Sequence, residues 1–191
     1  MFKPSHLLLS ALLGLLASGA TAQDKTELLV YSALEADQIK VYKEAFEKDH
    51  PAIALKFVRD STGIVTAKLL AEKANPQADA VFGLAATSLK LLDQNQMLMP
   101  YAPKGLQAIK AGMRDARPQP TWVGMDVWSS AICLNLPESL KRGLPKPASW
   151  SDLTNPAFKG QITMPHPASS GTGYLMVAAW IQLMGEQKAW A

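Results

Sequence analysis

The chain has 191 residues, of which 48% are hydrophobic, and its formal net charge is +3. This length suits one globular domain, or one and a half. This basic excess is small, and the sequence has no run of like charges and no internal repeat. The composition is therefore not that of a nucleic-acid-binding protein.

Residues 1–22 have the pattern of a secretory signal peptide. Lys3 gives a basic start, the stretch HLLLSALLGLLASGA is apolar, and Ala20-Thr21-Ala22 supplies small residues before a cleavage site. The alternative is an N-terminal membrane anchor, for which the apolar stretch is short. Cleavage would remove Lys3 and leave a net charge of about +2. We therefore expect an exported, soluble protein.

Three strands alternate with three helices in the next part of the chain. The predicted strands are short apolar runs at 27–33, 52–59 and 78–84. Apolar residues at helical spacing predict helices from residue 35 until Pro51 stops the first, and then at 63–76 and 87–97. This alternation predicts an α/β fold with a parallel sheet. Ligands bind such sheets beyond the carboxyl ends of the strands, so the loops YSALEAD, RDSTG and GLAATS are candidate binding loops.

The pattern changes near residue 121. The stretch TWVGMDVWSSAICLNLP is rich in β-branched and aromatic residues and predicts a long extended segment, and a further strand is expected at 161–164. A helix is predicted from about Thr172 to Gly185. Cys133, the single cysteine, can form no internal disulfide and is expected at a buried strand position. We interpret this part as the beginning of a second α/β lobe, and expect a longer chain to complete it.

Two loops share one design. DSTGIV (60–65) and ASSGTGY (168–174) each place hydroxyl side chains and glycine between a strand and the start of a helix. A helix N-terminus carries free N–H groups and a partial positive charge, which favour an anion. Helix capping selects the same residues, so the two interpretations stay open. Neither loop has a Walker or dinucleotide-binding motif, so any anion held there would be small.

Two further sites carry polar groups beside apolar segments. Tyr31 and Ser32 lie near the end of the first predicted strand, and both are candidate ligand-binding residues. Ser32 with Glu35 also fits a capping box, and Ser32 could both cap the helix and donate to a ligand. Asp126 lies between Trp122 and Trp128. A carboxylate with aromatic faces suits an ammonium group, whereas the alternative is a surface aspartate in a hinge strand.

The sequence lacks the common catalytic motifs. There is no HExxH pair for a metal, no G-x-S-x-G turn and no S-x-x-K nucleophile. His50 precedes a proline, and His166 lies between two prolines. We therefore expect no catalytic residue, no metal site and no cofactor. The rival class, an exported phosphoester hydrolase, would need a metal cluster or an activated nucleophile.

Several segments resemble one known family. DSTGIVTAKLLAEKANPQADAVFGLA, TWVGMDVW, GLPKPASWSDLTNPAFKGQITMPHPASSGTGY and WIQLMGEQKAW are similar to the periplasmic 2-aminoethylphosphonate-binding proteins of ABC transporters. The likeness runs from about residue 27 to the end. These proteins belong to a larger extracellular solute-binding group with iron(III)-binding and phosphosugar-binding members.

The resemblance implies a two-lobed, type II-like periplasmic binding protein whose lobes close on a ligand about a hinge. Lobe 1 would span residues 23–124, and residues 125–191 would hold the hinge strands and the incomplete lobe 2. The ligand would be 2-aminoethylphosphonate or a related phosphonate, with ferric iron or another phosphate-containing solute as alternatives. The protein would be a periplasmic monomer that delivers its ligand to the membrane permease.

The resemblance also implies ligand-binding residues in both loops. Ser32, Ser61 and Thr62 would approach the phosphonate from lobe 1. Ser169, Ser170 and Thr172 would approach it from lobe 2. The role of Asp126 as the ammonium partner is our own inference from its aromatic neighbours.

Overall fold

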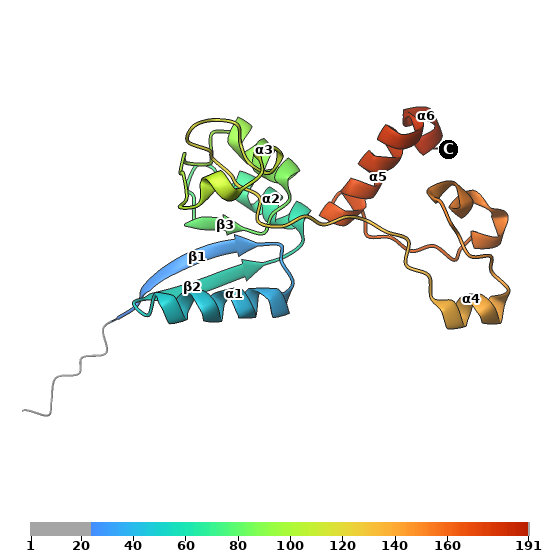
Figure 1. The fold of residues 1–191 in the computed structure, drawn as a ribbon, viewed down its shortest axis with the longest axis horizontal. Coiled ribbons are helices and arrows are strands. Elements are labelled where there is room, and N and C mark those ends of the chain that lie inside the picture. Colours follow the sequence, from blue (N-terminus) through green and yellow to red (C-terminus); the bar gives the residue numbers. More distant parts are fainter. Residues whose placement is uncertain (1–23, 191) are drawn as a thin grey trace, which may run out of the picture.

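The structure is a computed structural model that describes residues 24–190, so the predicted signal peptide at 1–22 lies outside the described residues. A three-stranded parallel sheet forms the middle layer of the N-terminal part (Figure 1), with strand order β2-β1-β3. The strands are β1 (Thr26–Ser32), β2 (Ile53–Arg59) and β3 (Ala80–Phe82). The predicted parallel sheet is confirmed. β3 is shorter than the apolar run at 78–84, because only residues 80–82 pair with β1.

Helices cover both faces of this sheet. Figure 1 shows α1 on one side and α2 and α3 on the other. Their bounds are α1 (Ala36–Asp49), α2 (Thr62–Ala71) and α3 (Ala86–Gln94). The core between the sheet and α2 and α3 contains Tyr31, Val65, Leu69, Leu84 and Leu92, all buried. Alternation along β1 sends Tyr31 to this side, which fixes which face of the sheet each helix can cover.

A charged cluster fastens the chain after α3. The Arg117 guanidinium donates to Asp93 of α3 at 2.7 Å and to Asp115 at 2.5 Å. The hydroxyl of Thr121 donates to Asp93 at 2.8 Å. The hydrogen bond from Arg117 is the main cause that holds the pKa of Asp93 below its ordinary value. Burial acts to raise the pKa of Asp115, but hydrogen bonds from Thr121 and Arg117 outweigh it and lower that pKa. The cluster therefore anchors the chain immediately before Trp122.

Residues 121–135 are extended but are not a strand. The only pairing in this segment of the described chain is an isolated antiparallel bridge between Arg114 and Val123. The prediction of a buried Cys133 is therefore wrong: its side chain is exposed. A β-branched, aromatic sequence favours extended backbone, but a strand also needs a hydrogen-bonded neighbour, and no described segment lies beside 125–135 in that way.

The remaining elements are helical. They are α4 (Leu136–Arg142), α5 (Gly171–Met184), α6 (Glu186–Ala189) and the 3₁₀ turns η1 (Leu106–Ala108), η2 (Ala111–Met113), η3 (Trp150–Thr154) and η4 (Pro156–Phe158). The predicted helix near 172–185 is confirmed as α5. The strand predicted at 161–164 is wrong, because these residues form a turn and irregular chain without a pairing partner. Among residues 24–190, no helix combines the length and apolarity that crossing a membrane requires.

Candidate functional site

A cleft of about 1460 Å³ opens at the carboxyl ends of the strands. Three loops that follow β1, β2 and β3 line it, as the position of ligand sites in open parallel sheets predicts. The residues Ser170, Gly171 and Thr172 at the start of α5 line the same cleft. The two hydroxyl-rich loops predicted from the sequence therefore reach one common space, although 108 positions separate Ser61 from Ser169.

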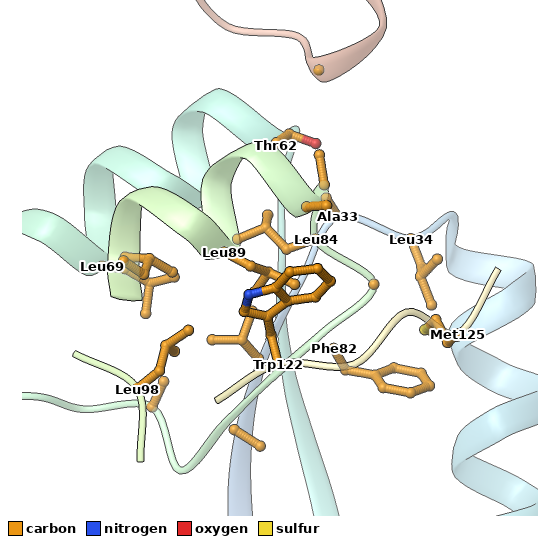
Figure 2. A pocket seen from close by; sticks show the side chains of 18 of the residues that line it. Ala33, Leu34, Thr62, Leu69, Phe82, Leu84, Leu89, Leu98, Trp122 and Met125 are labelled. Atoms are coloured by element: carbon orange, nitrogen blue, oxygen red, sulfur yellow. The ribbon is translucent and has the colours of Figure 1, made fainter. Parts of the chain in front are cut away.

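Apolar side chains form the interior wall of the cleft. Figure 2 shows the Trp122 indole among Leu69, Leu89 and Leu98, with Phe82 on its other side. Thr62 lies at the far end of this view, near Ala33 and Leu84. The cleft thus has one polar end, made by the two hydroxyl loops, and one apolar body. The sequence indicated Trp122 only as a neighbour of Asp126, and its place in this wall was not predicted.

The loop after β2 supplies donors at the N-terminus of α2. Ser61 is the N-cap residue, and its backbone N–H donates to the Asp60 carboxylate at 2.7 Å. Its hydroxyl donates to the backbone carbonyl of Ser169 at 2.7 Å. The hydroxyl and the backbone N–H of Thr62 have no hydrogen-bond partner among residues 24–190, and Thr62 lines the cleft. Free donors at a helix N-terminus favour an anionic oxygen.

The loop before α5 has a similar arrangement. Ser170 caps α5, since its Oγ accepts from the N–H of Gly173 at 3.3 Å, and its hydroxyl hydrogen remains available. The Ser169 hydroxyl donates weakly to the carbonyl of His166 at 3.4 Å. The backbone N–H groups of Gly171 and Thr172, and the Thr172 hydroxyl, have no partner within the described chain. Capping and anion binding are therefore compatible here, because one loop can do both.

Tyr31 and Ser32 lie beneath the cleft and do not line it. The Tyr31 hydroxyl donates to Glu72 at 2.9 Å, and the Lys68 ammonium lies 5.3 Å from the centre of the Tyr31 ring. Ser32 is fully buried, and its Oγ accepts from the N–H of Leu34 at 3.1 Å. Both hydroxyls thus stabilise the end of β1, and their predicted contact with a ligand stays a prediction.

The predicted capping box of Ser32 and Glu35 is wrong, because the box at the start of α1 is formed by Glu35 and Gln38. Glu35 is itself the N-cap residue of α1, and its backbone N–H donates to the side chain of Gln38 at 3.2 Å. The Ser32 hydroxyl oxygen instead accepts a hydrogen bond from the backbone N–H of Leu34, only two residues further along the chain. The Glu35 carboxylate instead pairs with Arg59, which also donates to the carbonyl of Leu34 at 2.9 Å. This pair bridges the loops after β1 and β2 at the rim of the cleft.

Asp126 and Trp128 line the cleft from the extended segment that joins the two parts of the chain. Both side chains are exposed, so the Asp126 carboxylate keeps its hydration. Its position agrees with either interpretation made from the sequence, a partner for an ammonium group or a surface aspartate. The residues that the structure describes contain no group of three or more His, Cys, Asp or Glu side chains arranged to hold a metal.

Residues 75–191 match the family described as bacterial extracellular solute-binding protein. The chain belongs to this family. This solute-binding protein is similar in sequence to an uncharacterized protein of Haemophilus influenzae. The identity is 30% over 179 residues, which cover 92% of this chain and 51% of the relative. It is also 26% identical, over 68% of this chain and 35% of the relative, to the probable ABC transporter periplasmic-binding protein y4fP of Sinorhizobium fredii.

The solute-binding protein also resembles a solved structure. The periplasmic binding protein AfuA of Actinobacillus pleuropneumoniae, described with fructose-6-phosphate bound, aligns with a TM-score of 0.73 at 30% identity, covering 87% of this chain and 53% of AfuA. The fold is therefore the α/β fold of periplasmic binding proteins. The chain spans about half the length of AfuA and of the Haemophilus relative.

Proposed function

We propose that this solute-binding protein is the periplasmic ligand-binding component of an ABC importer, and that it captures 2-aminoethylphosphonate or a related phosphonate. The observation that carries the proposal is the convergence of free donors at one end of the cleft. Two helix N-termini supply them, from Thr62 on one side and from Ser170, Gly171 and Thr172 on the other. Neutral N–H and O–H donors at helix ends are suited to a small oxyanion.

The strength of the interaction requires both loops. A hydrogen bond to a charged group is worth roughly 1.5–3 kcal/mol, so the two free donors of Thr62 supply about 3–6 kcal/mol. Association alone costs on the order of 4–15 kcal/mol, and micromolar affinity needs about 8 kcal/mol beyond that cost. The four further donors of the α5 loop bring the gross interaction to about 9–18 kcal/mol. Affinity in the micromolar range therefore depends on simultaneous contact from both sides.

The rest of the cleft suits the organic part of such a ligand. The apolar wall around Trp122 can cover an ethylene chain, and Asp126 and Trp128 can receive an ammonium group. AfuA, a relative with a phosphorylated sugar bound, supports a phosphoryl or phosphonyl ligand class. The permease subunits of an ABC importer would be the protein partners, and the monomer would be the working form.

Calorimetric titration of the full-length protein tests the ligand class. The titrants are 2-aminoethylphosphonate, inorganic phosphate, fructose-6-phosphate and ferric citrate. We expect the tightest binding with 2-aminoethylphosphonate. Tighter binding of phosphate, the sugar phosphate or iron would reject the phosphonate assignment, and release of p-nitrophenol from p-nitrophenyl phosphate would favour a hydrolase.

A pair of matched variants tests the site. Thr62→Val removes one free hydroxyl from the polar end of the cleft and should weaken binding by about tenfold or more. Thr66→Val is the control, because Thr66 lies one turn further along α2, is buried outside the cleft lining and donates to the carbonyl of Thr62 at 2.6 Å. Equal affinity of Thr62→Val and the parent protein would remove Thr62 from the site.

A further inference from the structure

The two hydroxyl loops touch each other directly at the N-terminus of α2. The backbone carbonyl of Ser169 accepts two hydrogen bonds there, from the hydroxyl of Ser61 at 2.7 Å and from the backbone N–H of Gly63 at 3.0 Å. Figure 1 shows α5 beginning beside this end of α2. A peptide carbonyl thus occupies one acceptor position at the helix end, where the partial positive charge favours it.

Glycine makes this close approach possible on both sides. A Cβ at Gly63 would lie 2.6 Å from the carbonyl oxygen of Ala168 and 2.8 Å from that of Ser169. A Cβ at Gly171 would lie 2.8 Å from Thr62 Oγ1 and 3.0 Å from Thr62 Cβ. The obstacles at Gly63 are backbone atoms, which cannot rotate away as a flexible side chain can. Any side chain at position 63 would therefore force the loops apart.

The contact divides the hydroxyls of the site into two sets. The Ser61 hydroxyl is committed to Ser169, whereas the hydroxyls of Thr62 and Thr172 keep free donors within the described chain. All partners of the contact are protein groups, so no ligand atom takes part in it. The contact joins the first turn of α2 to Ser169, the residue before the cap of α5. It therefore also fixes the distance between the free donors of Thr62 and the free donors at the start of α5.

We propose that Ser61, Gly63 and Gly171 are positioning residues that dock the loop 168–171 onto the N-terminus of α2 through the Ser169 carbonyl. They hold the two halves of the cleft's polar end at a fixed spacing. Loss of the docking frees the two parts of the chain to move relative to each other. The docking itself does not depend on the proposed function. Only its expected effect on ligand affinity rests on that function.

Pulsed electron paramagnetic resonance on the full-length protein measures the docking directly. Spin labels are attached through Lys40→Cys on α1 and Lys141→Cys on α4, both at exposed positions, in a Cys133→Ser background that removes the exposed native thiol. Without ligand, the parent should give a narrow distance distribution. We expect Gly63→Ala, Gly171→Ala and, to a smaller extent, Ser61→Ala to broaden it or shift it to longer distances.

Two comparisons separate docking from a merely structural role. Thr172→Ala deletes a hydroxyl in the same pair of loops that takes no part in the contact, so it should keep the parent distribution. Alanine is a better helix former than glycine, so a role confined to α2 predicts that Gly63→Ala leaves thermal stability unchanged or higher and the distribution unaltered. If Gly63→Ala fails to fold by circular dichroism, Ser61→Ala decides. Parent-like distributions for the docking variants, or an equal change in Thr172→Ala, would overturn the proposal.

Ligand affinity supplies the second readout. With 2-aminoethylphosphonate as the probe, Ser61→Ala should bind roughly three- to tenfold more weakly, because the free donors lose their fixed spacing. If the parent protein itself binds no phosphonate while the distance changes appear as expected, the proposed function fails and the docking stands. If the parent binds and the distances do not respond to Gly63→Ala or Ser61→Ala, the docking fails alone.

Discussion

Gly83, at the end of β3, offers a direct measurement of how tightly the cleft loops are packed. Its φ angle is +70°, and a Cβ built there would lie 2.2 Å from Cγ of Leu34, which is buried in the loop after β1. Gly83→Ala therefore combines two penalties. The left-handed backbone costs a residue with a Cβ roughly 1–2 kcal/mol, and overpacking a filled site costs typically about 1–3 kcal/mol more.

Gly105→Ala is the matched control for this substitution. Gly105 has a φ angle of +80°, but nothing lies within 4 Å of a Cβ built there. Its replacement should cost only the backbone term of about 1–2 kcal/mol. Urea unfolding followed by circular dichroism gives both free energies of unfolding. We expect Gly83→Ala to be the less stable of the two by about 1–3 kcal/mol.

The double variant Gly83→Ala/Leu34→Ala completes the test. Truncation of Leu34 removes the atoms that the new Cβ would meet, so the double variant should be more stable than the sum of the two single effects predicts. Equal costs for Gly83→Ala and Gly105→Ala, together with additive effects in the double variant, would refute the reasoning that Leu34 and Gly83 are in close contact.

Three further predictions follow from the same structure. Arg117→Met should lower stability at neutral pH, because the pKa values of Asp93 and Asp115 are lowered in the folded state. The stabilisation from these two carboxylates is present above their unfolded pKa of about 3.9 and is lost as the pH falls through their folded pKa values. In urea unfolding measured across pH, the difference in stability between variant and parent should therefore shrink below about pH 4. Gln96→Gly should stabilise the protein by about 1 kcal/mol in the same assay, because Gln96 has a φ angle of +58° at the end of α3, and a loss of stability would contradict this. Cys133 should react with Ellman's reagent in the native protein as fast as in urea, and marked protection would contradict its exposure.

The N-terminal part was predictable because its signals are local. Short apolar runs, helical spacing and Pro51 mark strands and helices within a few residues of where the structure has them. The parallel sheet then follows from their alternation, since helices between strands impose parallel pairing. The ends of elements were less predictable. α2 ends at Ala71, five residues before the predicted end at Pro76, and β3 keeps only the residues that pair with β1.

The segment from 121 to 164 was not predictable in the same way. β-branched and aromatic residues favour extended backbone, which residues 125–135 do adopt, but strand formation depends on a partner that composition does not specify. The helix α4 was missed although its signals are present. Asn135 caps it, accepting from the N–H of Glu138 at 3.2 Å, Pro137 lies in its first turn, and Gly143 ends it with a φ angle of +63°.

The hydroxyl loops show where reasoning from the sequence stops for the site itself. Ser61 and Thr62 are adjacent and chemically alike, and the sequence gives no reason to separate them. The structure separates them because the partner of Ser61 is a carbonyl from a distant segment. One local sign was available: Gly63 and Gly171 lie inside the first turns of their helices, where glycine lowers helix propensity. A residue that costs helix stability at such a position indicates a close approach by another segment, and both glycines have one.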